Sequence, residues 1–266
     1  MSIELNNVSY SINQKSLVKN INFKIIPGEL HVLLGQNGAG KSTIFKLLCG
    51  DIKPTSGSVQ MHGKDLRDWS PKDLSLIRSV LTQDYELNFP FLVSEVVELG
   101  RIQFPFEKEK NSIAVNGTLH LTDMNHFKNR DYSSLSGGEK QRTQYARVLS
   151  QIWDEPYKYL LLDEPTAGMD LANQIRLLEI SAEMAKKGYG VMLILHDLNS
   201  AYQYADRITF IKEGRIFVSG SPKELIDPDL LKQIYGVNLE VIWTEQGIFF
   251  IPKNKMKETN YERSFS

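Results

Sequence analysis

The sequence predicts an α/β fold with an antiparallel β part near the N-terminus and an inserted α-helical part. A glycine-rich loop joins an apolar strand at residues 29–34 to a helix that begins near residue 43. Two later apolar strands, at 159–162 and 190–195, end directly in polar residues. From about residue 85 to residue 154 the apolar residues follow helical spacing instead. These three observations indicate a strand-rich core interrupted by helices.

The composition excludes several classes of protein. With a net charge of −1 and a pI of about 6.5, the 266 residues carry no basic patch, so nucleic acid is not expected as a partner. The single cysteine, Cys49, cannot form an internal disulfide and fits a reducing compartment. No basic leader followed by an apolar run is found, and no stretch approaches the ~18 apolar residues that a membrane span needs. We therefore expect the chain itself not to cross a membrane.

The order of the elements follows from turns and helix-start signals. Ahead of the glycine-rich loop, strands joined by turns predict an antiparallel arrangement. A helix is expected after Ser70, because a Ser cap, Pro71 and then Asp73 are helix-start signals. The other strands are expected at 3–10, 17–25, 57–61, 79–82, 207–211, 214–218, 239–243 and 247–251, and helical segments at 94–99, 111–121, 139–153 and 198–204. The polar tail, 253–266, is expected to be mobile.

The glycine-rich loop matches a phosphate-binding pattern of two glycines separated by four residues, then Lys and a hydroxyl residue. In a strand-to-helix turn its backbone N–H groups and the helix N-terminus both favour a bound polyphosphate. Lys41 would reach the outer phosphates, and the Ser42 hydroxyl would bind Mg²⁺. The whole loop comprises Gly35, Gln36, Asn37, Gly38, Ala39, Gly40, Lys41, Ser42 and Thr43.

A second candidate phosphate site lies at the start of the long helix in the inserted part. The run Leu135, Ser136, Gly137, Gly138, Glu139 precedes that helix. Ser136 and Glu139 have the spacing of a capping box, and the two glycines leave the helix N-terminus open to an anion. A plain helix cap would explain Ser136 and Glu139, but not two consecutive glycines, which cost helix stability at ~1 kcal/mol each.

Acids and a histidine follow two of the apolar strands. The strand at 159–162 leads into Asp163 and Glu164, and the strand at 190–195 leads into His196. Residues at the carboxyl ends of parallel strands face the crevice where α/β sheets bind ligands. We expect Asp163 to hold Mg²⁺, Glu164 to orient the attacking water or take its proton, and His196 to hydrogen-bond a γ-phosphate.

Tyr10 and Gln83 have two interpretations each. Tyr10 ends the first strand and would either stack on a purine base or pack within the sheet. Gln83 follows the strand at 79–82, and by itself a lone Gln is usually a surface amide.

Together these motifs resemble those of the ATP-binding cassette (ABC) ATPases, over about residues 3–240. The resemblance implies the P-loop NTPase ABC ATPase fold, with a RecA-like core, and ATP and Mg²⁺ as ligands. It implies that Tyr10 stacks on adenine, that Gln83 contacts Mg²⁺ and the attacking water, that Glu164 is the catalytic carboxylate and that His196 is the switch histidine.

The same resemblance implies a homodimer. The signature residues, Leu135, Ser136, Gly137 and Gly138, would close over the ATP held by the partner subunit, so that two chains enclose two ATP molecules. The resemblance also places Asp170 among the residues that bind the nucleotide. It follows Ala167-Gly168-Met169, where many members have Ser-Ala-Leu. Met for Leu preserves an apolar contact, so activity is expected to survive.

The resemblance also divides the chain. Residues 1–252 would form a single ABC ATPase domain, with residues 1–84 and 155–252 as the catalytic core and its β subdomain. Residues 85–154 would form the helical signature subdomain, where a permease docks. Asn88 to Phe91 and Arg101 would lie near the groove that receives the permease. The alternative is that the aromatic residues are core of the helical part and that Arg101 is solvated.

Three kinds of ABC protein remain possible: an importer, an exporter's separate ATPase, and a soluble protein of repair or translation. The soluble class is disfavoured, because its members usually carry two cassettes or a long coiled coil. The stretches 89–101 and 196–206 look like those of importers of iron chelates, haem and cobalamin, and residues 151–158 are similar to haem-importer members. The prediction is therefore haem import, with ferric siderophore or cobalamin as alternatives. It places the homodimer on the cytoplasmic face of a bacterial inner membrane, bound to two permease subunits and supplied by a periplasmic binding protein.

Overall fold

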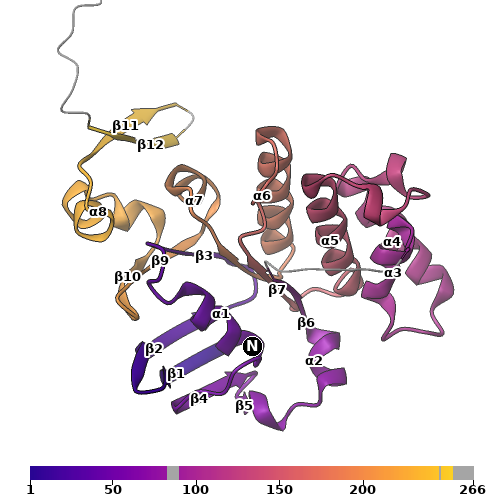
Figure 1. Cartoon of the computed structure of the whole chain (residues 1–266), viewed down its shortest axis with the longest axis horizontal. Helices are drawn as coiled ribbons and strands as arrows, with labels where there is room; N and C mark the ends of the chain where they lie inside the picture. The colour runs from indigo at the N-terminus through magenta and orange to yellow at the C-terminus, as the bar shows by residue number, and fades with distance from the viewer. Residues whose placement is uncertain (83–89, 246, 254–266) are drawn as a thin grey trace, which may run out of the picture.

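The computed structural model describes residues 1–82, 90–245 and 247–253, which form two main sheets and a terminal hairpin (Figure 1). The predictions for Gln83, for Asn88 and Phe89, and for the tail from residue 254 onward lie outside these residues. The strands are β1 (Ile3–Ile12), β2 (Lys15–Ile25), β3 (Leu30–Gly35), β4 (Ser56–Met61), β5 (Lys64–Asp65), β6 (Arg78–Leu81), β7 (Tyr159–Asp163), β8 (Gly190–Ile194), β9 (Arg207–Lys212), β10 (Arg215–Gly220), β11 (Leu239–Thr244) and β12 (Gly247–Pro252). The α-helices are α1 (Lys41–Cys49), α2 (Pro71–Ile77), α3 (Val93–Glu98), α4 (Lys108–Leu121), α5 (Gly137–Gln151), α6 (Leu171–Lys186), α7 (Leu198–Tyr204) and α8 (Pro228–Tyr235), and 3₁₀ turns lie at Leu66–Asp68, Leu99–Arg101, Asn125–Phe127, Tyr132–Ser134 and Pro222–Leu225.

The central sheet has six strands in the order β10-β9-β3-β8-β7-β6. Its five strands from β9 to β6 are parallel, and β10 pairs antiparallel with β9. Parallel strands buried on both faces consist of near-continuous apolar runs, as β7 and β8 do here. The apolar strands predicted from the sequence are therefore the centre of the fold.

The N-terminal strands form a separate antiparallel sheet in the order β2-β1-β4-β5. The burial pattern of β2 alternates near its end, with Ile21, Phe23 and Ile25 buried and their neighbours exposed. This alternation indicates a sheet with one face on the core and one in water. Each strand predicted from the sequence is found within two residues of its expected bounds, but the helices α6 and α8 were not predicted.

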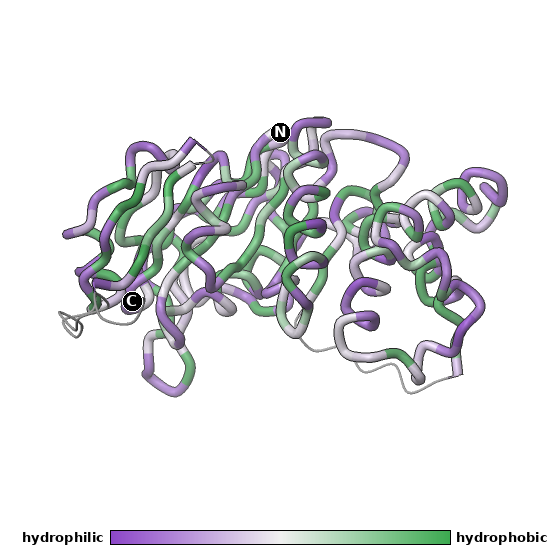
Figure 2. Tube along the Cα trace, turned by 90° about the horizontal axis from the view of Figure 1, so that it is seen from above, coloured by the Kyte–Doolittle hydropathy of each residue, from purple (hydrophilic) through white to green (hydrophobic). Residues whose placement is uncertain are grey.

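Two apolar cores cover the two faces of the central sheet. Successive residues of β3 alternate between them, so that Leu30, Val32 and Leu34 face one core and Leu33 the other. The first core includes residues of α5, α6, α7 and α8, and the second includes α1 and the antiparallel sheet. Figure 2 shows these apolar strands running through the body of the molecule.

The helical part between β6 and β7 has a smaller core of its own. Val93, Val96 and Val97 of α3 are buried with Leu119 of α4 and Ala146 of α5. α5 also contributes Tyr145 and Val148 to the core of the central sheet, so it belongs to both cores and connects the helical part to the sheet. Among the described helices, none is both long and apolar enough to span a membrane.

A buried histidine generates a prediction about acid stability. Burial lowers the pKa of His31 to about 3, and its Nε2 lies 2.7 Å from the Thr209 hydroxyl. The pKa of the same histidine in the unfolded chain is near 6.5. Between these two values the unfolded chain therefore binds a proton that the folded chain does not. The free energy of unfolding should fall by up to about 1.4 kcal/mol per pH unit as the pH drops below about 6.5. Urea unfolding at several pH values would measure this slope.

His31→Gln provides the control for this prediction, because glutamine does not titrate in that range. The variant should lack this part of the pH dependence. An equal slope in the wild-type and variant chains would contradict the prediction.

Candidate functional site

The glycine-rich loop joins β3 to α1, as predicted, and its lysine is held across it. Lys41 is 5% exposed, and its Nζ donates hydrogen bonds to the carbonyl oxygens of Gly35 (2.8 Å) and Gln36 (3.2 Å). Burial lowers the pKa of Lys41, while the carboxylates of Glu164 and Asp163 oppose that shift. The ammonium group therefore lies against the loop and within electrostatic reach of Asp163 and Glu164, where outer phosphates would bind.

Gly35 occupies a position that a larger residue cannot take. Its φ is +153°, and a Cβ built there would lie 2.3 Å from the carbonyl oxygen of Ile211. That neighbour is backbone of β9 and cannot rotate away. The loop can therefore adopt this path beside β9 only because residue 35 has no side chain.

The predicted acids and histidine meet at the carboxyl ends of two neighbouring strands of the central sheet. Asp163 ends β7, Glu164 follows it, and His196 comes two residues after β8, the neighbouring parallel strand. The Nε2 of His196 lies 2.5 Å from Oε1 of Glu164. The sequence predicts that both residues lie at these strand ends, but it does not predict their direct contact, because the contact depends on the register between β7 and β8.

Asp163 has the environment of a metal ligand. It is 6% exposed, and among the described residues its Oδ1 has no hydrogen-bond partner. Burial, and next the neighbouring carboxylate of Glu164, raise its pKa to about 6 against the opposing effect of Lys41. A buried carboxylate oxygen and the Ser42 hydroxyl at the start of α1 are ligands that Mg²⁺ accepts, so these residues fit the ion.

Tyr10 lies beside the loop. It pairs with Val18 across β1 and β2. A Cβ built on Gly40 would lie 2.9 Å from the Val18 side chain. The half-buried ring of Tyr10 also packs at the border of the core that α1 enters. This position is compatible with either interpretation of Tyr10, so stacking on adenine stays a prediction.

The predicted capping box at the start of α5 is confirmed. The backbone N–H of Ser136 donates to Glu139 Oε2 (2.7 Å), and the N–H of Glu139 donates to Ser136 Oγ (3.4 Å). Gly138 lies close to the segment before α6, since a Cβ there would be 3.3 Å from the Gly168 carbonyl oxygen. Leu135, in contrast, is 5% exposed and packs in the helical core, so only its backbone can face a ligand.

Asp170 caps α6 within its own chain. Its Oδ1 accepts a hydrogen bond from the backbone N–H of Asn173 at 2.9 Å, and its Oδ2 accepts one from the Asn173 side chain at 2.7 Å. These bonds lower the pKa of the Asp170 carboxyl. The carboxylate is exposed, and its role in nucleotide binding stays a prediction.

Arg101 is buried, so the alternative of a solvated side chain is wrong. Its Nη2 lies 2.6 Å from Asp154 Oδ2, its Nη1 donates to the carbonyl oxygen of Ser150 (2.9 Å) and its Nε donates to Asn111 Oδ1 (2.9 Å). It connects the 3₁₀ turn after α3 to α4 and to the end of α5. Together with Phe91 it lines a groove of about 700 Å³ on the helical part.

Comparison with known proteins decides the family. A family model described as ABC transporter matches residues 18–167, which include the glycine-rich loop, the start of α5 and the acids Asp163 and Glu164. The chain belongs to the ABC transporter family. As an ABC ATPase it binds and hydrolyses ATP, and the predicted ABC ATPase fold is confirmed.

The relatives of this ABC ATPase match it over most of its length. The hemin import ATP-binding protein HmuV of Pseudoalteromonas translucida (strain TAC 125) is 42% identical and covers 88% of the chain and 92% of the relative. The protein of the same name from Rhodopseudomonas palustris (strain BisB5) is 39% identical, with 94% and 96% covered. Among solved structures, cbiO1 from Clostridium perfringens, part of the transporter complex cbiONQ, has a TM-score of 0.71, 29% identity and 87% and 92% coverage. The dimeric ATP-binding cassette MJ0796 bound to ADP and phosphate has a TM-score of 0.72, 25% identity and 83% and 98% coverage.

Gly35→Ala should weaken ATP binding about tenfold or more, because the strain of displacing the loop, on the order of 1–3 kcal/mol, acts on the bound state. Equilibrium binding of a fluorescent ATP analogue would measure it. Gly63→Ala is the matched control. Gly63 also has a positive φ, +78°, but a Cβ there would meet nothing within 4 Å, and it lies outside the site. Equal affinity in both variants would contradict the importance of the contact with Ile211.

Proposed function

We propose that this chain is the ATP-hydrolysing motor subunit of a bacterial importer of haem. The observation that carries the proposal is the cluster at the sheet edge, where Glu164 and His196 lie 2.5 Å apart beside buried Asp163 and Lys41. Such a cluster suits hydrolysis of a phosphate bond, because positioning and electrostatic stabilisation supply nearly all the catalysis in phosphoryl transfer. The relatives named as hemin import ATP-binding proteins support haem as the cargo.

In this proposal Glu164 orients the attacking water and takes its proton, and His196 holds Glu164 and meets the γ-phosphate. Lys41 and the backbone N–H groups of residues 35–43 hold the phosphates, and Tyr10 covers the adenine. Ser42, Asp163 and Gln83 would hold Mg²⁺, which neutralises phosphate charge when bound. The assignment of Gln83 rests on the family resemblance alone.

We further propose that two chains bind two ATP molecules between them. Ser136, Gly137 and Gly138 of one chain would face the ATP on the other, and Asp170 would lie in the same interface. A solved relative of similar fold is dimeric, which supports this arrangement. Moving two subunits from mostly open to mostly closed takes on the order of 5 kcal/mol of differential affinity, which two ATP molecules can supply.

The motor would act on two permease subunits in the inner membrane, from its cytoplasmic face, with a periplasmic binding protein delivering the cargo. In the proposed division of the chain, residues 85–154 receive the permease, and residues 1–84 and 155–252 carry out hydrolysis. The groove beside Phe91 and Arg101 is the proposed docking site. Because the cargo passes through the permease, no residue of this chain needs to bind it.

Glu164→Gln should leave ATP binding intact and lower turnover at least about a hundredfold, because glutamine cannot accept the proton of the attacking water. Phosphate release and equilibrium ATP binding would measure the two quantities. Lys41→Ala is the contrasting variant and should weaken binding itself. Turnover at the wild-type rate in Glu164→Gln would contradict the assignment of the catalytic carboxylate.

A strain lacking the gene should fail to grow under iron limitation when haem is the iron source. Growth on haem should return with the wild-type gene and not with the Glu164→Gln gene, which makes the variant the control for activity. Growth with a ferric siderophore and in cobalamin-dependent medium should stay normal. Normal growth on haem with failure on either of the other two would assign the cargo to that chelate and keep the motor function.

A further inference from the structure

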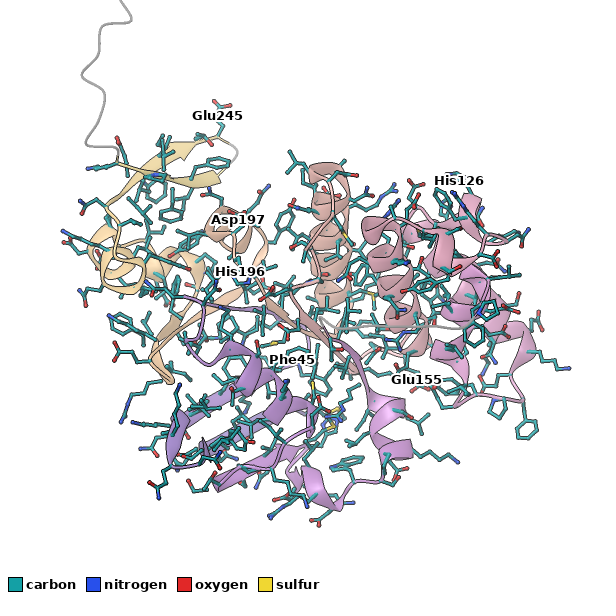
Figure 3. All side chains as sticks on the ribbon, viewed as in Figure 1. Phe45, His126, Glu155, His196, Asp197 and Glu245 are labelled. Carbon is teal, nitrogen blue, oxygen red and sulfur yellow. The ribbon has the colours of Figure 1, made fainter. Side chains whose placement is uncertain are left out.

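The hairpin of β11 and β12 packs against α7, the short helix that begins two residues after His196. Figure 1 shows the hairpin beside α7, on the side away from α6. In Figure 3 His196 and Asp197 lie between the central sheet and α7, and Glu245 marks the tip of the hairpin. The exposed segment that carries the proposed switch histidine therefore leads from the sheet into the helix on which the hairpin packs.

Asn199 of α7 pairs with the open edge of β12. The backbone N–H of Phe250 donates to Asn199 Oδ1 at 2.8 Å, and Asn199 Nδ2 donates to the carbonyl oxygen of Phe250 at 3.4 Å. The other edge of β12 is paired with β11. One side-chain amide thus supplies the donor and the acceptor that a third strand would supply, which satisfies backbone groups that would otherwise lack partners.

An aromatic contact fixes the same two elements one helical turn further on. The rings of Tyr202 and Phe250 have centroids 4.4 Å apart at 62°, and both side chains are buried. The hydroxyl of Tyr202 donates to the carbonyl oxygen of Leu225 at 2.6 Å. α7 is therefore attached to the C-terminal part of the chain at both Asn199 and Tyr202.

The C-terminal part also contacts the phosphate loop. Gln36 donates a hydrogen bond from Nε2 to the carbonyl oxygen of Ile234 in α8, at 2.9 Å. α8 directly precedes the hairpin, and Ile234 is buried. The C-terminal part of the chain thus contacts the phosphate loop through α8 and the helix that follows His196 through β12.

From these contacts we propose that Asn199 is a positioning residue for ATP hydrolysis. By joining α7 to the edge of β12, it keeps the start of α7 in place and so keeps His196 against Glu164. This inference rests on the proposed role of His196. Asn199 acts through α7, because its own amide is engaged with Phe250 and not with the nucleotide site.

The test uses the full-length chain with MgATP, and compares steady-state turnover with equilibrium ATP binding. Asn199→Ala should lower kcat about 10- to 100-fold, the cost expected of a small misplacement of a catalytic group, with the ATP Kd changed by less than about twofold. Asn199→Asp keeps an acceptor for the Phe250 N–H and should recover most of the kcat. Gln203→Ala, which removes an exposed amide from the same helix, is the matched control and should behave as wild type.

His196→Ala, measured in parallel, separates this inference from the function on which it rests. Wild-type kcat in Asn199→Ala, together with lost turnover in His196→Ala, would overturn the inference and leave the proposed function standing. Wild-type kcat in His196→Ala would instead remove the role of His196. A lower melting temperature with kcat and ATP affinity falling together, and no recovery in Asn199→Asp, would also overturn the inference, because Asn199 would then only stabilise the fold.

Discussion

The pairing of β7, β8 and β3 as adjacent parallel strands is the constraint on which the site depends. In this register Asp163 lies opposite Ile194, and Ile194 lies opposite Leu33. The carboxyl ends of these three neighbouring strands therefore lie side by side, and the first polar residues after each strand meet there. Both faces of the sheet are buried, so such residues can reach water only at the strand ends.

The electrostatics of the site follow from that meeting. Asp163 and Glu164 are adjacent in the chain, and the buried Lys41 interacts electrostatically with both carboxylates. Burial raises the pKa of Asp163 and lowers the pKa of Lys41, which means that each charged form is costly in the isolated chain. A polyphosphate would stabilise the charged lysine and a divalent cation the charged aspartate. The site is thus matched to a ligand that brings both.

The elements around the sheet are joined to the site by buried polar contacts. Arg101 joins the 3₁₀ turn after α3 to α4 and to the end of α5 through its bonds to Asp154, Ser150 and Asn111. α5 then connects that part to the sheet that bears Asp163. On the other side, Asn199 and Gln36 join the C-terminal segment to α7 and to the phosphate loop. These contacts connect the nucleotide site to the helical part on one hand and to the C-terminal segment on the other.

The sequence by itself determined the α/β class, the phosphate loop, the capping box at α5 and the acids and histidine at strand ends. These features depend on local chemistry, such as glycine spacing, capping and apolar runs, which neighbouring residues decide. Only the tertiary structure decided the strand order, the contact of His196 with Glu164, the burial of Arg101 and the pairing of Asn199 with Phe250. Each of these features depends on residues that are far apart in the chain. The register of the sheet and the packing of its layers bring such residues together, and a local sequence pattern does not specify either.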